Sequence, residues 1–356
     1  MQRSKMDFSK IFIKNATATK IGGQAVMEGI MMKGEDRTAI VVRLPDSSFF
    51  IKTEKLKKKS KLTKIPILRG VLIFVDSLIT GFRSLMYSAE VLAQFDMDEA
   101  QRQEETATEE ETPSVKTVTS PEKEGASFKV AMFFSVALAL LFTIGIFIVG
   151  PTWAINFVGG WVHSEIVLNL IEGFLRIVLF VLYIAAISRM KDIQTVFRFH
   201  GAEHKCIHCY ENGLPLTPEN CRSFETLHPR CGTSFLMFVM VISLLLFSLL
   251  GWPNLLVRIA SRILFIPLIA GLSYELLRWA GRSDNLAVRI LSVPGLLLQR
   301  LTTKVPEVAE LEVAIASMKA VLVPPDTEVY EGFCDKEGRP KEKDCEEAVA
   351  EVTGRD

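Results

Sequence analysis

Long apolar stretches separate the polar parts of this chain. Residues 130–150 and 233–252 contain no charged side chain, and each is about as long as the roughly 20 residues that a helix needs to cross a membrane. Residues 166–187 and 255–279 are similarly apolar but include charges. The pattern predicts a mainly α-helical, polytopic membrane protein with about four transmembrane helices and a small N-terminal β-containing cytoplasmic region.

The charges inside two of these predicted spans need partners. Glu172 and Arg176 are spaced i,i+4, so they can pair on one helix face, either as a structural salt bridge or as part of a functional polar site. In the fourth span, Arg258 and Arg262 can extend to the membrane surface, and Pro267 is expected to kink the helix.

The loops between the predicted spans differ in charge, and this difference predicts an orientation. The spans pair into hairpins over 128–187 and 233–280. Segments 151–165 and 251–254 lack Lys and Arg, whereas 188–232 contains several. Because Lys and Arg concentrate in cytoplasmic loops, we expect a multi-pass protein of the inner, or plasma, membrane with both termini in the cytoplasm. The lipid bilayer is then its first partner.

The N-terminal residues 1–60 are predicted to form a cytoplasmic β-hairpin region. Residues 38–44 and 49–53 are β-branched or aromatic runs, and the turn sequence Pro-Asp-Ser-Ser separates them. Before them, Gly22 and Gly23 permit unusual backbone angles or the close approach of another chain.

The remaining segments differ in composition. Within residues 61–95, the stretch 66–94 is apolar at a helical period but carries four charges. This favours amphipathic helices over 61–95 that lie on the membrane surface, with a buried helix of the soluble domain as the alternative. Residues 96–127 are acidic and rich in Glu, Thr, Ser and Pro, which is typical of a disordered linker. Residues 281–356 are expected to be cytoplasmic, with a short amphipathic helix over 307–320 and a loose tail beyond about 335.

All but one of the five histidines lie between residues 200 and 228. On a helix, His200, His204, His208 and Glu211 share one face, with Glu203 at its edge. The order His-x-x-Glu-His is the inverted zincin spacing, in which two imidazoles hold zinc and the glutamate activates a water molecule. The pattern predicts His200 and His204 as ligands of a divalent, zinc-type metal and Glu203 as a general base.

A second polar cluster begins at His228, at the mouth of the third predicted span. His228 or Cys231 can complete the metal shell, and Arg230 can hold an anionic group or pair with an acidic residue. Glu275 can reach the same region from the fourth span. A hydrogen-bonded structural network is the alternative for all these histidines, and the remaining one, His163, is interpreted as an interfacial polar residue.

The cysteines offer a different metal site. We place all six in the cytoplasm, where disulfides are rare. Cys206, Cys209, Cys221 and Cys231 could form a zinc-ribbon-like set, although the second pair lacks the Cys-x-x-Cys spacing of such sites.

Four stretches together resemble the YqhQ-like family of bacterial membrane proteins, which have unknown function and are often labelled predicted metal-dependent enzymes. They read IGGQAVMEGIMM (21–32), HGAEHK (200–205), HPRCGT (228–233) and PGLLLQRLTT (294–303). The resemblance covers about residues 20–320 apart from the acidic linker. The family pattern matches the candidate site residues His200, Glu203, His204, Glu211, His228, Arg230 and Cys231. It does not require Cys206, His208 or Cys209 as ligands. The resemblance also implies Glu28 as a further candidate carboxylate.

Two functions follow from these observations. The first is a membrane metalloprotein with a cytoplasm-facing zinc-type site, acting as a metal-dependent hydrolase on a membrane-associated peptide or lipid. The second is a non-enzymatic membrane scaffold or regulatory protein whose histidine cluster is structural. A transporter is disfavoured because no internal repeat is evident. The balanced charge gives no indication of nucleic acid as a partner, and a homo-oligomer stays open.

Overall fold

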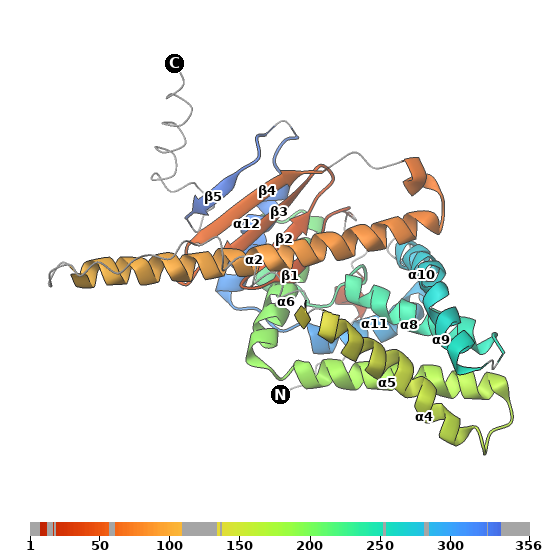
Figure 1. Cartoon of the computed structure of the whole chain (residues 1–356). Coiled ribbons are helices and arrows are strands. Elements are labelled where there is room, and N and C mark those ends of the chain that lie inside the picture. The colour runs from red at the N-terminus through yellow and green to blue at the C-terminus, as the bar shows by residue number, and fades with distance from the viewer. Residues whose placement is uncertain are drawn as a thin grey trace. The chain divides into compact units, whose positions relative to one another are not determined.

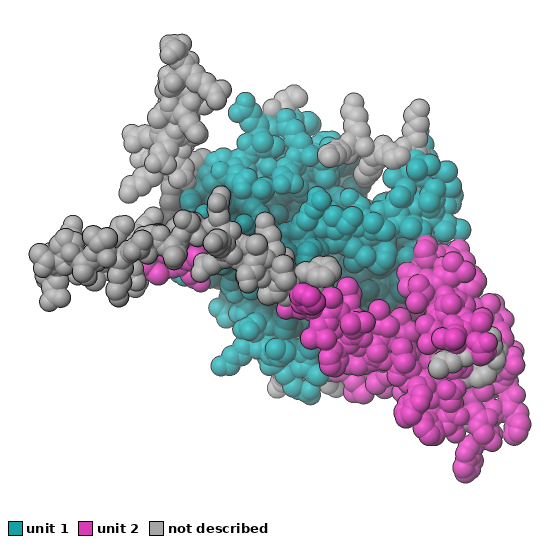
Figure 2. Space-filling view, in the orientation of Figure 1, with its two compact units in different colours: residues 1–95, 184–239, 270–356 teal, residues 96–183, 240–269 magenta. Residues whose placement is uncertain are grey.

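A computed structural model of the chain describes residues 8–12, 17, 19–56, 61–108, 134–135, 137–251, 254–280, 285–325 and 327–335 (Figure 1). The chain divides into two compact units. Unit 1 contains residues 1–95, 184–239 and 270–356, and unit 2 contains residues 96–183 and 240–269 (Figure 2).

Unit 1 is built on a five-stranded antiparallel sheet with the order β1-β2-β3-β4-β5. The strands are β1 (Gly22–Val26), β2 (Gly29–Lys33), β3 (Arg37–Arg43), β4 (Phe49–Lys55) and β5 (Glu331–Cys334). The predicted hairpin is present as β3 and β4, which pair from Arg43↔Phe49 onwards. Asp46 Oδ1 accepts a hydrogen bond from Ser48 N at 2.8 Å and so closes its turn. The last strand, β5, comes from the C-terminal part of the chain, so both ends of the chain contribute to this sheet.

Helices cover both faces of this sheet. On one face lie α6 (Lys191–Glu211) and α12 (Val308–Val321), the second close to the amphipathic helix predicted at 307–320. Between them and the strands lies a buried core that includes Ile30, Met32, Phe199, Ala202, Leu311 and Ala314. On the other face lies α2 (Leu68–Thr108), whose Val91 packs against Val42 of β3. Figure 1 shows α2 in front of the strands and α12 behind them.

Helix α2 differs from the sequence prediction in its length. It is one continuous helix of 41 residues, so the linker boundary expected at residue 96 lies inside it, and residues 109–127 of the predicted linker are outside the described residues. Its side chains divide between two surroundings, because Val91 packs against the sheet whereas Leu78, Ile79 and Phe82 are exposed.

Among the described residues, three helices are long and apolar enough to cross a membrane: Leu68–Met97, Ala137–Phe157 and Glu165–Ile187. Leu256–Leu264 and Ile266–Ala280 make a fourth if this pair, bent by 41°, counts as one span. The bend lies next to Pro267, as predicted. The orientation of the termini stays a prediction.

Two predicted spans need correction. The helix expected at 233–252 is α8 (Gly232–Ser248), which has 17 residues and is shorter than the candidate spans. The helix expected at 130–150 continues to Phe157, through a π-helical turn, Gly145–Val149, and α4 (Gly150–Val158). Pro151 lies directly after this π-helical turn, in the first turn of α4, and it has no backbone N–H to donate to the preceding turn.

Unit 2 contains α4, α9 (Leu255–Leu264) and most of α5 (Glu165–Ile187), and a buried carboxylate joins them. Glu172 accepts from Arg176 Nη2 at 2.5 Å, which confirms the predicted pair, and from Arg262 Nη2 at 2.6 Å. Arg258 and Arg262 are buried, so the expectation that they extend to the membrane surface is wrong. Their guanidinium groups instead donate to partners inside the unit, Arg258 to Thr152 O at 3.2 Å.

The other elements of unit 1 are short or connect these layers. They are α1 (Phe8–Ile11), the 3-10 turn Lys61–Lys64, α7 (Pro218–Arg222), α11 (Leu286–Thr302) and the end of α10 (Ile266–Ala280). Helix α11 approaches α8 closely, because a Cβ on Gly295 would lie 2.6 Å from Ser234 Oγ. This contact brings the C-terminal end of α11 beside the segment that leads into α8.

Candidate metal centre

Helix α6 carries the predicted constellation, and the helix confirms the shared face. His204, His208 and Glu211 are buried along it, and Glu203 is 5% exposed. The helix lies between the sheet and the segment 222–231, so its polar side chains face protein groups rather than solvent. A buried polar side chain needs a hydrogen-bond partner, and the partners here come from distant parts of the chain.

The proton positions of two histidines follow from their backbone partners. His200 Nδ1 lies 2.8 Å from Thr302 O, and His204 Nδ1 lies 2.5 Å from Thr226 O. Because a carbonyl oxygen only accepts, each Nδ1 carries the proton. In the neutral ring, each Nε2 then carries the lone pair, which is the arrangement that orients histidine ligands in metal sites.

These two histidines converge on Cys231. His200 Nε2 lies 3.1 Å from Cys231 Sγ, and one ligand atom from each of His200, His204 and Cys231 lies within 4.8 Å of the others. His204 Nε2 is buried and has no hydrogen-bond partner among the described residues. Two imidazole nitrogens and a sulfur are donors that zinc prefers. We call these three residues the ligand group.

The ligand group is electrostatically coupled. Burial raises the pKa of the Cys231 thiol, but the neighbouring His200 and His204 outweigh this effect and hold the pKa well below its ordinary value. Burial lowers the pKa of His200, but contact with Cys231 outweighs it and raises that pKa to about 9. Sulfur and imidazole therefore stabilise each other's charged forms in this pocket.

His228 belongs to a second group, with His208 and Glu211. Its Nε2 lies 3.6 Å from Glu211 Oε2, and its Nδ1 accepts from Arg230 N at 3.3 Å. His208 Nε2 bonds Leu227 O at 3.0 Å. The predicted set of His200, His204, His228 and Cys231 is thus divided, because the nitrogens of His228 already face Glu211 and Arg230.

Glu211 is the centre of this second group, which we call the Glu211 network. Its Oε1 accepts from Thr19 N and Thr19 Oγ1, both at 2.9 Å, and from Arg230 Nη2. Burial raises the pKa of Glu211, but His228, Thr19 and Arg230 outweigh it and hold the pKa at about 2. Burial also lowers the pKa of His208 to about 4. The network therefore holds a charged carboxylate and a neutral His208.

Glu203 lies beside the ligand group and against β1. A Cβ on Gly23 would lie 2.9 Å from Glu203 Cδ, so the close approach predicted for the glycine pair occurs within this chain. Burial raises the pKa of Glu203, and the neighbouring His200 and His204 oppose this effect only in part. Glu203 Oε2 is buried without a hydrogen-bond partner among the described residues, so one oxygen is available to a ligand.

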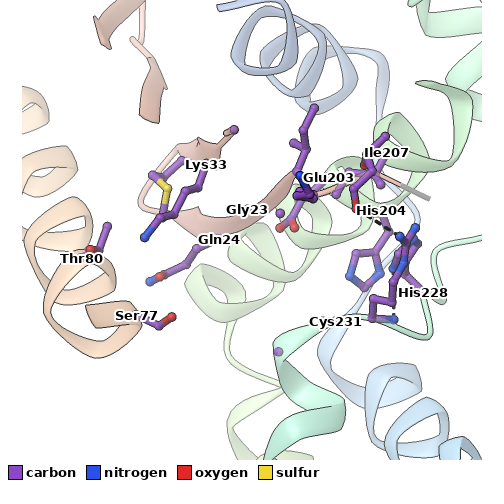
Figure 3. A pocket seen from close by; sticks show the side chains of 18 residues that line it. Gly23, Gln24, Lys33, Ser77, Thr80, Glu203, His204, Ile207, His228 and Cys231 are labelled. Atoms are coloured by element: carbon purple, nitrogen blue, oxygen red, sulfur yellow. Dashed lines mark hydrogen bonds between the residues drawn. The ribbon is translucent and has the colours of Figure 1, made fainter. Parts of the chain in front are cut away.

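A cavity of about 400 Å³ opens beside these groups. Figure 3 shows Glu203, His204, His228 and Cys231 on one side of it and Gln24, Lys33, Ser77 and Thr80 on the other. Its walls thus come from α6, the segment before α8, the first two strands and α2. A small molecule or part of a chain entering it would meet Glu203 and His204.

Other candidates from the sequence lie elsewhere. Glu28 is exposed in the turn between β1 and β2, with φ at 47°. Glu275 pairs with Arg69, whose Nε lies 2.6 Å from Glu275 Oε1, so it does not join the cavity. The zinc-ribbon-like set does not assemble, because Cys206, Cys209 and Cys221 lie in the buried core between the sheet and α6, whereas Cys231 contacts His200. The five described cysteines are free, and Cys345 is outside the described residues.

Gln299 is a site residue that the chemical reasoning did not identify. Its side chain forms two hydrogen bonds to the backbone of His228, accepting from the N–H and donating to the carbonyl, both at 2.8 Å. It also donates to Ser234 Oγ at 3.0 Å. The only sequence signal was its position in the 294–303 motif of the family resemblance. A single glutamine on an apolar helix forms no spaced motif that would identify it as a site residue.

We predict that Gln299→Ala destabilises the protein by about 1–3 kcal/mol, since it leaves the buried N–H and carbonyl of His228 without partners. Chemical unfolding of the purified protein in detergent, followed by circular dichroism, measures this change. Gln194 on α6 gives a matched control, because it is only half-buried and its hydrogen bond to Arg189 O is exposed. Gln194→Ala is expected to change stability by less than about 0.5 kcal/mol. Equal stabilities of the two variants would contradict the role given to Gln299.

Comparisons with known proteins agree with the resemblance. A family model described as "Protein of unknown function (DUF1385)" matches residues 65–323. An "Uncharacterized protein YqhQ" from Bacillus subtilis (strain 168) is 32% identical over 313 residues, which cover 87% of this chain and 94% of that protein. No solved structure gives a significant match.

Proposed function

Since the chain belongs to the DUF1385 family of proteins of unknown function, we propose from its own residues that it is a membrane metal-dependent hydrolase with its site on α6. The observation that carries this proposal is the convergence of two oriented imidazoles and one sulfur beside a buried glutamate. The donor atoms come from α6 and from the segment before α8, which are joined by hydrogen bonds to α11.

The donors favour zinc over other common ions. His200, His204 and Cys231 offer two nitrogens and a sulfur, whereas Mg²⁺ and Ca²⁺ prefer oxygen donors. Three protein donors leave a fourth tetrahedral position open, which distinguishes catalytic zinc sites from closed structural ones. When bound, zinc would supply Lewis acidity and make a water molecule more acidic.

The chain's own residues supply the rest of the chemistry. Glu203 lies against Gly23 and has one oxygen without a partner, so it is placed to accept a proton from a water molecule in the cavity and pass it to a leaving group. Arg230 also lines the cavity. It is held by Glu211 and by Thr19 O at 3.2 Å, and it can stabilise negative charge that develops nearby.

The wall of the cavity that α2 forms supports a membrane-associated substrate for this site. Ser77 and Thr80 line it from α2, and both lie within Leu68–Met97, which is long and apolar enough to cross a membrane.

The Glu211 network favours a different role for the remaining histidines. His208 and His228 have hydrogen-bonding or charged partners, and we propose that they have a structural role. The alternative drawn from the sequence gave this role to the whole histidine cluster.

Metal content tests the proposal directly. We expect the purified protein to hold about one zinc per chain by elemental mass spectrometry, and we expect His200→Ala, His204→Ala and Cys231→Ser each to lose most of it. His163→Ala is a matched control, since His163 is exposed in a loop of unit 2. We expect it to retain zinc.

His228→Ala separates this assignment from the set predicted from sequence. Because His228 faces Glu211, we expect this variant to keep most of its zinc. A wild-type protein that restores function to a deletion strain while it is free of metal would overturn the proposed function. Full zinc retention by Cys231→Ser with loss in His228→Ala would replace Cys231 by His228 in the ligand group.

A further inference from the structure

The first strand, β1, forms a free edge of the sheet. Its neighbour in the sheet order is β2 on one side, and no other described strand lies beyond it. The two strands are joined by a two-residue turn that Val26↔Gly29 closes. Hydrogen-bonded and non-hydrogen-bonded pairs alternate from such a closing pair, so residues 23 and 25 direct their backbone groups away from β2.

This free edge borders the cavity that contains the candidate site. Residues 19–24 line it together with His204 and Cys231. Gly22 and Gly23 are exposed, and a Cβ added to Gly22 would meet no atom within 4 Å. The backbone of β1 is therefore accessible from the same space into which Glu203 and His204 point (Figure 3).

Helix α2 closes the opposite side of this space. Gln24 donates to Gly81 O at 3.3 Å, and a Cβ on Gly81 would lie 2.3 Å from Gln24 Oε1, so α2 is in direct contact with β1. The hydroxyls of Ser77 and Thr80 follow along the same wall. The cavity thus follows the strand edge, with α6 on one side and α2 on the other.

We propose that the substrate is a peptide in extended conformation that adds to the free edge of β1 as a further strand. Strand addition satisfies the alternating N–H and C=O groups of an edge, and a lipid has no such alternation. This inference rests on the proposed function, and it chooses the peptide over the lipid. In the reaction, the oxygen of water bonds to the scissile carbonyl carbon, the C–N bond breaks, and the proton taken up by Glu203 passes to the leaving nitrogen.

A peptide library derived from a whole proteome tests the substrate class. We expect the full-length, zinc-loaded protein in detergent to cleave a subset of these peptides, as identified by mass spectrometry, and Glu203→Gln to cleave none. Vesicles of phosphatidylglycerol and phosphatidylethanolamine form the second arm. Hydrolysis of lipid alone, or of neither substrate by zinc-loaded protein, would overturn the inference. Zinc content, measured on the same sample, reports separately on the proposed function.

The use of the β1 edge is tested on a peptide found in that library. Methylation of successive backbone nitrogens is expected to raise KM at every second residue near the cleaved bond, because alternate amides of an added strand face its neighbour. Uniform effects along the peptide, or none, would exclude strand addition.

A protein variant provides the complementary test. Gly22→Leu places a side chain in the open space beside the strand, and we expect kcat/KM to fall about tenfold or more, mainly through KM. Gly160→Leu is the matched control, since Gly160 also has open space around a Cβ and lies in unit 2. We expect it to leave kcat/KM unchanged. Unchanged zinc content and unfolding temperature in Gly22→Leu exclude misfolding, and wild-type kcat/KM in that variant would overturn the role of the edge.

Discussion

Glu203→Gln is expected to lower kcat for peptide cleavage by about 10²–10⁴-fold, the usual contribution of a general base. Glutamine has nearly the same shape, so it can occupy the same space beside Gly23. It cannot take a proton from water. The ligand group does not include Glu203, so zinc content is expected to remain that of the wild type, and KM is expected to change little.

Single-turnover rates on a peptide from the library, together with metal analysis of the same samples, measure these effects. Glu219→Gln is a suitable control because Glu219 is exposed on α7, and we expect it to cleave at the wild-type rate. A loss of zinc in Glu203→Gln would make the carboxylate a ligand. A variant that keeps both zinc and its full rate would remove Glu203 from the chemistry.

The histidine face was predictable because it depends on helical period alone. Residues spaced four apart lie on one face of any helix, so His200, His204 and His208 had to share a face once α6 formed. The choice of the third ligand depends on a loop instead. His228 is held by Gln299, from a helix about 70 residues further along the chain, and no local pattern shows which way its ring then points.

The number of candidate spans was harder to predict because charges were counted without their partners. Four charged residues argued against a span in the segment 66–94. Two of them have partners from distant segments, since Arg69 pairs with Glu275 and Asp76 lies 2.6 Å from Lys33 Nζ. A paired charge costs less in an apolar environment than a single one, and Leu68–Met97 is apolar enough by its composition to be a candidate span.

The same reasoning explains the two buried arginines of α9. The sequence predicted that Arg258 and Arg262 extend toward the membrane surface, because a flexible side chain at a helix end can do so. Glu172 and Thr152 instead supply acceptors inside unit 2. The i,i+4 partner of Glu172 was visible in the sequence, but the partner on α9 was not.

The Glu211 network carries the largest predicted effect on stability. We expect Glu211→Ala to destabilise the protein by about 3–5 kcal/mol, the cost of removing one partner from a buried charged pair. Glu211 is 5% exposed. Its removal leaves Arg230 without its carboxylate and Thr19 without the acceptor for its N–H and hydroxyl. The segment that leads into β1 would then lose two hydrogen bonds to α6 and keep the backbone bond from Thr17 N to Glu211 O at 2.9 Å.

Glu211→Gln separates charge from hydrogen bonding. Its amide oxygen can still accept from Thr19, so we expect a smaller loss of about 1–3 kcal/mol. Glu219 on α7 is exposed, and Glu219→Ala is expected to stay within about 0.5 kcal/mol of the wild type. Chemical unfolding in detergent, followed by circular dichroism, measures all three variants. A loss below about 1 kcal/mol in Glu211→Ala would show that the network does not support the fold.

Metal analysis of these same variants tests whether the two groups on α6 are separate. The ligand group shares no residue with the Glu211 network, so folded Glu211→Gln protein is expected to retain its zinc. The rings of His204 and His228 are nevertheless 5.6 Å apart between centroids. Loss of zinc from folded Glu211→Gln would therefore mean that Glu211 and the three histidines of α6 act with Cys231 as one centre. Retention of zinc would assign metal binding to one turn of α6 and the attachment of β1 to the next.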